Sequence, residues 1–176
     1  MRKKLICIAL FILLLCSGCG ANLTGVNETA KSDDDIADQC IETIIEAITN
    51  NDNEALIEMF SITALNEIDM TVFEQSINEL FTTWQGEVVE YDGELSTATN
   101  RHSGKTMHSI NGFYDIETTD TTHHLLFLSV VRDDENSDNV GLSMIVFVTD
   151  ELYQSDDFYW EYGNREPGIY IDKIDE

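Results

Sequence analysis

Hydrophobic side chains recur at helical spacing over residues 36–48. Isoleucines, alanines and Cys40 return every three or four residues there, which places them on one face of an α-helix. Ser32 and Asp35 match a variant of the capping box, and neighbouring aspartates add negative charge at the N-terminal end of the helix dipole. The pattern predicts a long amphipathic helix that ends near residues 50–53.

Further helices are predicted between this point and Gly86. Residues 54–60 predict a short helix, and Ser61 is placed to cap another turn. Thr71 and Glu74 fit the T-x-x-E capping box, so we expect the next helix to begin there and to end at Gly86. Its apolar face comprises Phe73, Ile77, Leu80, Phe81 and Trp84.

After Gly86 the period changes to that of β-strands. Residues 87–91 predict a first strand, whereas residues 94–105 are polar and predict either a long loop or a ragged edge strand. Apolar and polar side chains alternate over residues 114–119, which is typical of a half-exposed strand. HLLFLSVV and NVGLSMIVFV are apolar on both faces and predict central strands, and GIYID predicts the last strand.

The order of these elements, helices first and strands afterwards, predicts an α+β fold over residues 32–176. We expect the N-terminal helices to pack on one face of a curved antiparallel sheet of about five strands. No internal repeat or change of composition divides this part of the chain. It is therefore expected to form a single domain.

The N-terminus resembles the signal of bacterial lipoproteins. Basic residues precede a short apolar run, and Ser17, Gly18 and Cys19 follow it. In that family the signal is cleaved before the cysteine, which carries a diacylglyceryl group. The resemblance implies a lipid on Cys19 and cleavage of the Gly18–Cys19 bond. The chain departs from the pattern at Cys16, which stands where leucine is usual.

Residues 1–18 are accordingly expected to be a signal peptide and residues 19–31 a flexible tether, because the tether is small and polar without periodicity. The apolar run is too short to span a bilayer comfortably as a helix. A lipidated Cys19 carries at least two acyl chains, which hold a protein firmly on a membrane. We expect the domain to stay at the extracytoplasmic face of the bacterial membrane. The alternatives are a signal anchor and plain secretion.

Without the signal, the chain is strongly acidic. Nine Lys and Arg residues, less the three in the signal, leave six against 34 Asp and Glu residues, a formal charge of −28. This balance excludes nucleic acid as a partner and opposes a flat orientation on anionic lipid. The simplest explanation of such a charge is that it keeps the protein soluble. The alternative explanation is that the charge binds a cationic partner or loosely held divalent ions.

The cysteines are not expected to form a disulfide within the chain. Once the signal is removed and Cys19 is acylated, only Cys40 remains. Cys40 lies among isoleucines, so we expect a small core residue.

Several segments resemble a family of uncharacterised lipoproteins of low-GC Gram-positive bacteria, classed as a domain of unknown function. They are the tether, the first helix, NNDNEALIEMFS, LFTTWQG, DNVGL and GIYI. The resemblance covers residues 33–172 and implies a nuclear transport factor 2-like (cystatin-like) cone, often with a pocket between helix and sheet. It implies no reaction and no ligand, because related folds include isomerases, dehydratases, transport adaptors and immunity proteins.

Motifs for catalysis or metal binding are weak. His123 and His124 are adjacent and should face opposite sides of a strand, so they do not form one metal site. The acidic loop at residues 133–138 lacks the glycine and glutamate of an EF-hand, and we read it as a solvated hairpin loop with weak calcium binding as the alternative. No cofactor is expected.

A pocket enzyme of the ketosteroid isomerase type would need an aspartate base and a donor tyrosine in an apolar pocket. The suggestive pairs are Asp115 beside Tyr114 and Asp172 beside Tyr170. Neighbours on a strand face opposite ways, so neither pair is a ready-made site.

The stretch FYWEY at residues 158–162 is the strongest candidate for a binding surface. Its aromatics cannot all be hidden on an alternating strand, and acidic residues surround them. Tyr159, Trp160 and Tyr162 are the candidate binding residues, and the alternative is a structural plug. The hypothesis is a membrane-anchored, non-catalytic binding module for a small ligand or a surface protein. The alternatives are a pocket enzyme and an immunity or signalling adaptor.

Overall fold

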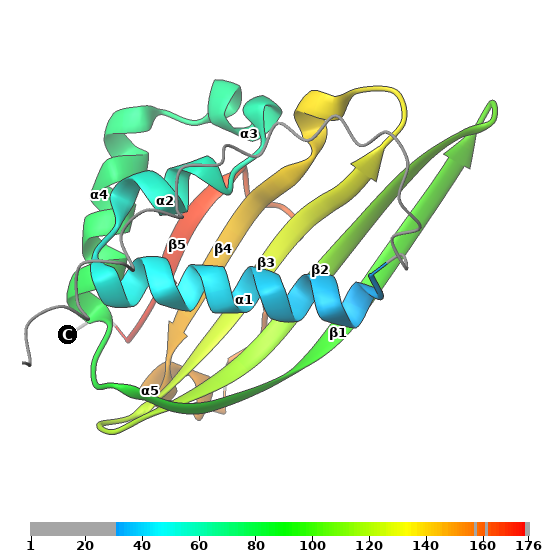
Figure 1. The fold of residues 1–176 in the computed structure, drawn as a ribbon. Coiled ribbons are helices and arrows are strands. Elements are labelled where there is room, and N and C mark those ends of the chain that lie inside the picture. Colours follow the sequence, from blue (N-terminus) through cyan, green and yellow to red (C-terminus); the bar gives the residue numbers. More distant parts are fainter. Residues whose placement is uncertain (1–30, 157, 161, 175–176) are drawn as a thin grey trace, which may run out of the picture. The chain divides into compact units, whose positions relative to one another are not determined.

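Helices occupy the first part of the domain, as the sequence predicts. In the computed structural model, residues 31–156, 158–160 and 162–174 are described, and they belong to one compact unit that begins at Lys31 (Figure 1). The expected signal peptide and most of the tether, with Gly18 and Cys19, lie outside the described residues. The N-terminal helices are α1 (Asp33–Asn50), α2 (Asn53–Glu58), α3 (Ile62–Glu67) and α4 (Met70–Thr83).

The capping box of α1 is confirmed. The Ser32 hydroxyl accepts a hydrogen bond from the Asp35 amide at 3.1 Å, and the Asp35 carboxylate accepts one from the Ser32 amide at 3.1 Å. The helix ends at Asn51, whose φ of 52° is left-handed, so the predicted end near residues 50–53 is also confirmed. The buried face of α1 consists of Ala37, Ile41, Ile44, Ala47 and Ile48.

The predicted start of α4 at Thr71 is wrong by two residues. Asp69 is the N-cap, because its carboxylate accepts hydrogen bonds from the amides of Thr71 and Val72. The predicted apolar face holds at Phe73, Ile77 and Leu80, which are buried.

The sheet has five strands in the order β1-β2-β3-β4-β5. Their bounds are β1 (Val88–His102), β2 (Lys105–Thr118), β3 (Thr122–Asp133), β4 (Gly141–Thr149) and β5 (Gly168–Asp172). A short 3₁₀ helix, η1 (Ser137–Asn139), and a short helix, α5 (Asp150–Tyr153), flank β4. The fold is therefore α+β, with helices before a mostly antiparallel sheet.

One open alternative about this sheet is decided, and one expectation needs correction. The polar segment predicted as a long loop or a ragged edge strand belongs mostly to an edge strand, β1, which is continuous and paired along its length with β2. The last strand is parallel to β4, so the sheet is not an antiparallel meander throughout. The parallel direction follows from the chain's path, since α5 and a long segment come between β4 and β5.

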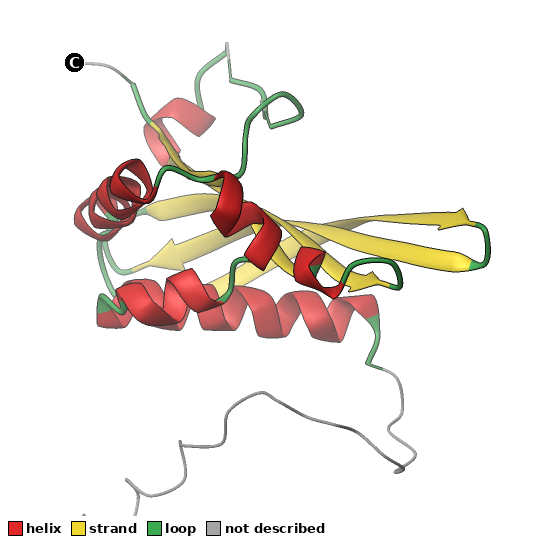
Figure 2. Ribbon diagram, turned by 90° about the horizontal axis from the view of Figure 1, so that it is seen from above, coloured by secondary structure: helices red, strands yellow, loops and turns green. Residues whose placement is uncertain are grey.

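Both faces of the central strands are covered. Figure 2 shows α1 on one side of the sheet and α5 with the loop that follows it on the other. The helix-side core includes Ile44, Phe127 and Phe147, whereas Leu126 and Val146 belong to the smaller cluster on the opposite face. This confirms the prediction that the two apolar runs are central strands.

The described residues contain no helix that is long and apolar enough to cross a membrane. All the buried hydrophobic residues of the described core come from residues 37–169. Residues 31–176 therefore include the complete core seen here, and we expect this part to fold independently.

Candidate functional site

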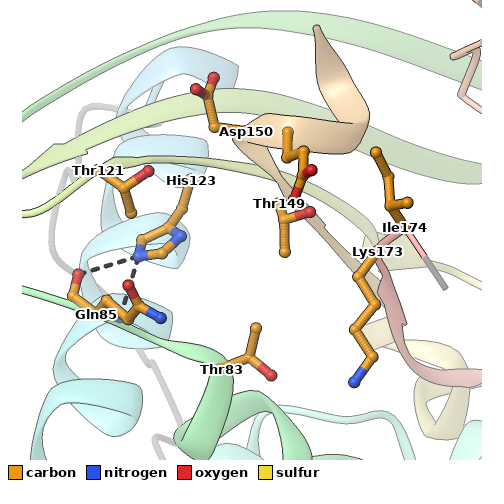
Figure 3. Close-up of a pocket in the computed structure, with 9 residues that line it drawn as sticks. Thr83, Gln85, Thr121, His123, Thr149, Asp150, Lys173 and Ile174 are labelled. Atoms are coloured by element: carbon orange, nitrogen blue, oxygen red, sulfur yellow. Dashed lines mark hydrogen bonds between the residues drawn. The ribbon is translucent and has the colours of Figure 1, made fainter. Parts of the chain in front are cut away.

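A pocket of about 630 Å³ lies where the end of α4 meets the ends of the central strands. Figure 3 shows most of its walls. In chain order, its lining residues are Thr83, Gln85, Thr121, His123, Thr149, Asp150, Glu151, Lys173 and Ile174. We call this the His123 pocket. Three hydroxyls, an amide, an imidazole and charged groups converge there from segments that are distant in the sequence.

The turn after α4 sets the first wall of the pocket. Gly86 has a φ of 82°, a left-handed conformation that side chains beyond glycine rarely adopt. A Cβ at Gly86 would lie 2.7 Å from the Thr118 hydroxyl oxygen. Glycine therefore allows the chain to turn tightly from α4 into β1, and this turn presents the Gln85 backbone to β3.

His123 forms the inner wall. Its residue is 2% exposed, and its ring stacks on Trp84 with centroids 4.7 Å apart and lies 5.0 Å from the Phe147 ring. Its Nε2 atom lies 3.0 Å from the Gln85 carbonyl oxygen and 3.2 Å from the Gln85 amide nitrogen. One tautomer donates to the carbonyl and the other accepts from the amide. Either hydrogen bond anchors the His123 ring to the backbone of Gln85, just after α4.

Two buried ring nitrogens have no hydrogen-bond partner among the described residues: His123 Nδ1 and Trp84 Nε1. In Figure 3 the second nitrogen of His123 lies on the side of the ring that faces away from Gln85, and this atom is not accessible to solvent. Burial lowers the pKa of His123, and this is the largest of the influences on it. The ring is therefore neutral at physiological pH. Its Nε2 atom is hydrogen-bonded to Gln85, and its Nδ1 atom has no partner among the described residues. An unpaired buried polar atom lowers the stability of the folded state.

His124 faces the opposite side of β3, as predicted for adjacent residues on a strand. Its Nδ1 lies 2.6 Å from an Asp115 carboxylate oxygen, and its Nε2 lies 3.2 Å from an Asp150 carboxylate oxygen. The ring stacks on Tyr153 with centroids 3.6 Å apart. These contacts hold the start of α5 against the sheet, and with it the pocket rim at Asp150.

The charged rim of the pocket is dominated by acidic groups. Asp150 and Glu151 contribute two carboxylates from the start of α5. The Lys173 ammonium lies 2.8 Å from the Glu79 carboxylate, so its charge is partly offset. The arrangement favours a neutral or cationic ligand over an anion.

The aromatic candidates Tyr159, Trp160 and Tyr162 are separated by the structure. Tyr159 is 69% exposed, whereas Trp160 and Tyr162 pack against the cluster on the sheet face away from α1. The rings of Trp160 and Tyr162 meet Phe113 at centroid distances of 5.8 and 6.0 Å. These two residues cover the sheet, and Tyr159 is the one that faces outward. The described residues of this segment, 158–160 and Tyr162, are not in a strand, although the sequence pattern suggested one.

The other sequence candidates are engaged in local structure. Burial raises the pKa of the Cys40 thiol to about 12, which makes it unreactive at physiological pH. Asp115 pairs with His124, and Asp172 forms a bidentate ion pair with Arg165. Neither aspartate reaches a tyrosine partner in a shared site.

The acidic hairpin loop also uses its carboxylates internally. Asp133 accepts hydrogen bonds from the amides of Glu135 and Asn136 and from the side chain of Asn139, and these lower its pKa. Asp134 pairs with Arg132. In the described parts of the chain, no group of three His, Cys, Asp or Glu side chains is arranged to hold a metal ion.

Sequence reasoning missed the His123 pocket. His123 and Gln85 are 38 residues apart, and the turn that joins them depends on the pairing of β1 with β2. The only local signal was the His123–His124 doublet at the start of an apolar run.

The domain, an α+β fold with a polar pocket at one end of its sheet, belongs to a known family. The family is DUF5104, a domain of unknown function, which matches residues 43–150. This range contains α2, α3, α4, the first four strands and the central residues of the pocket. No curated protein matches the chain.

Replacing His123 by phenylalanine should make stability less dependent on pH. Because the folded-state pKa of His123 lies below its ordinary value of 6.5, the unfolded chain takes up the proton first on acidification. Its contribution to stability is complete above about pH 6.5 and is lost as the pH falls toward the folded-state pKa. Urea denaturation at about pH 7.5 and pH 5.5 should therefore show a smaller loss for His123→Phe than for the parent. An equal loss in both proteins would contradict a buried neutral His123.

Proposed function

We propose that this protein is an extracytoplasmic lipoprotein whose domain binds a small polar ligand in the His123 pocket and releases it unchanged. The observation that carries the proposal is a pocket of about 630 Å³ on which the hydroxyls of Thr83, Thr121 and Thr149, the His123 ring and the charges of the rim converge. The size of the pocket falls within the range usual for small-molecule sites.

The ligand should be neutral or cationic and able to form several hydrogen bonds. Thr83, Thr121 and Thr149 supply hydroxyls that both donate and accept. The rim carboxylates of Asp150 and Glu151 oppose an anionic ligand. Sugars, amino sugars and amines fit this description.

Binding accounts for the geometry better than catalysis does. A general base needs a nitrogen within hydrogen-bond reach of the proton that it removes. In His123, Nε2 is held by Gln85 and Nδ1 is fully buried. The Asp150 carboxylate contacts His124 and Gln154. A pocket enzyme with His123 as its base is the alternative, and it would require the ring to leave Gln85.

The membrane anchor is the second part of the proposal. It rests on the order of basic residues, apolar run, Ser17, Gly18 and Cys19. Two acyl chains on Cys19 hold a domain firmly without a spanning helix. The separate resemblance of segments such as NNDNEALIEMFS and LFTTWQG supports membership among lipoproteins of low-GC Gram-positive bacteria. A nuclear transport factor 2-like fold is supported by the long α1 that lies across the sheet (Figure 1).

Filling the pocket should weaken ligand binding. Thr83 lines the pocket in the last turn of α4, where a cationic side chain suits the helix dipole. Thr83→Arg should weaken binding at least about tenfold, a loss of about 1.4 kcal/mol. Calorimetric titration with glucosamine, spermidine and glucose measures it, and citrate is the anionic comparison. Thr82→Arg is the matched control, because Thr82 is exposed on the same helix and is not among the lining residues.

The expected pattern is binding of at least one of the three probes to the parent and to Thr82→Arg, with citrate bound more weakly. Equal affinity for Thr83→Arg would place the ligand elsewhere. Failure of all three probes to bind the parent would contradict the proposed ligand class.

Replacing Cys19 by serine should remove the lipid, because the acylated atom is the thiol sulfur. Cells labelled with palmitate should show label on the parent and none on Cys19→Ser, which should stay uncleaved or appear in the medium. The control is Cys16→Ser, which leaves the acylation site intact. Label on the Cys19→Ser protein would show that the anchor lies elsewhere.

A further inference from the structure

His124 joins two carboxylates that belong to different elements of the fold. Its side chain is 3% exposed, and its register partners are Asp115 on β2 and Val148 on β4. The Nδ1 atom lies 2.6 Å from an Asp115 carboxylate oxygen, and the Nε2 atom lies 3.2 Å from an Asp150 carboxylate oxygen at the start of α5. Asp150 is also one of the residues that line the His123 pocket. The His124 ring therefore connects the middle of the sheet to the rim of the pocket.

Two hydrogen bonds to carboxylates require two protons on the ring. An ionised carboxylate only accepts hydrogen bonds, and a neutral imidazole has a single N–H. A doubly protonated ring satisfies both contacts of His124 at once, because each nitrogen then donates. The Tyr153 ring stacks on His124 with centroids 3.6 Å apart and 11° between the planes, and a tyrosine face attracts a cation. The geometry is therefore that of a positively charged His124.

The other titratable groups around the ring keep their charge near neutral pH. Burial, followed by the charges of Asp115 and Glu94, raises the pKa of Tyr153, so its hydroxyl stays neutral. His123 faces the other side of β3, and burial lowers its pKa, so its ring is neutral as well. Histidine is the side chain that ordinarily changes charge between about pH 5 and 8. His124 is therefore the group through which pH acts on this cluster.

We propose that His124 is a pH-sensitive clamp on Asp150 that sets the affinity of the His123 pocket for a cationic ligand. This inference rests on the function proposed above. In the doubly protonated state the ring donates to Asp150 and supplies a positive charge beside the rim. When the ring releases one proton to solvent, the proton that remains stays on Nδ1, where the contact with Asp115 is shorter. The Nε2 lone pair then faces the Asp150 carboxylate, and two acceptors repel each other.

Release of Asp150 changes the rim in one direction. In Figure 3 the Asp150 carboxylate points away from His123, which is the orientation in which His124 holds it. The Asp150 side chain is 40% exposed, so solvent is available to it when the contact with His124 is lost. Loss of the positive ring charge also leaves the carboxylates of Asp150 and Glu151 uncompensated at the rim. A cation in the pocket is therefore attracted more strongly as the pH rises, whereas a neutral ligand gains nothing from this change of charge.

Calorimetric titration with spermidine between about pH 5.5 and 7.5 tests the clamp, because the amines of spermidine stay protonated over this range. The affinity of the parent protein should rise at least about threefold with pH. The midpoint of the rise should coincide with the loss of a His124 ring proton in ¹⁵N spectra of the ligand-free protein. His124→Gln, whose amide donates but does not titrate, should bind spermidine with an affinity that does not rise. His102→Gln, at an exposed position at the end of β1, is the matched control and should retain the rise.

The other outcomes overturn the clamp and are distinguishable from a failure of the proposed function. An affinity for spermidine that does not change with pH, or a rise that follows a group other than His124, overturns the clamp alone. An unchanged rise in His124→Gln does the same, because a merely structural His124 would lower the affinity without setting its pH dependence. Binding of glucose without binding of spermidine also leaves the proposed function intact and overturns the clamp.

A lack of binding of spermidine, glucosamine and glucose at every pH overturns the proposed function, and the clamp with it. Circular dichroism establishes that each variant is folded. The comparison of the two midpoints uses the parent protein alone, so it decides the question even where His124→Gln does not fold.

Discussion

The burial of β3 and β4 on both faces is the constraint on which the rest of this structure depends. Strands with apolar side chains on both faces must be covered from two sides, because exposed apolar surface costs about 25 cal/mol per Å². The N-terminal helices cover one face, and α5 with the aromatic segment after it covers the other. The chain has to pass from one face to the other after β4. That passage makes β5 parallel and brings Asp150 and Lys173 to the end of the sheet where α4 terminates.

The two adjacent histidines show how this constraint produces a site. Because neighbours on β3 face opposite layers, His123 enters the helix-side core and His124 enters the other one. His124 satisfies both ring nitrogens with carboxylates and fixes α5. His123 satisfies only one, through Gln85, and its ring forms the wall of the pocket. His124 therefore has a structural role and His123 a candidate binding role, because the pleat of β3 turns the two side chains to opposite faces of the sheet.

The sequence was sufficient where local chemistry decides the structure. The Ser32–Asp35 cap, the apolar stripe of α1 and the two fully apolar strands all follow from short-range patterns. The sequence was insufficient where segments that are distant in the chain determine the structure. Thr71 and Glu74 fit a capping box, but the Asp69 carboxylate accepts from the Thr71 amide that Glu74 would bind in that box. The polar half of β1 is a strand because β2 pairs with it, and polar side chains are acceptable on an exposed edge. The pocket depends on contacts between His123 and Gln85 that no local pattern encodes.

The state of the His123 ring tests the central claim, a preformed pocket with the neutral His123 ring in its wall. The direct measurement is the pair of ¹⁵N chemical shifts of the His123 imidazole at neutral pH, with and without a saturating pocket ligand chosen from glucosamine, spermidine or glucose. The account predicts a neutral ring in both states and a shift of the His123 ring nitrogens on binding, while the ring nitrogens of His102, exposed near the β1–β2 turn, stay unchanged. A doubly protonated ring without ligand, or His123 signals that do not move when ligand binds, would contradict it.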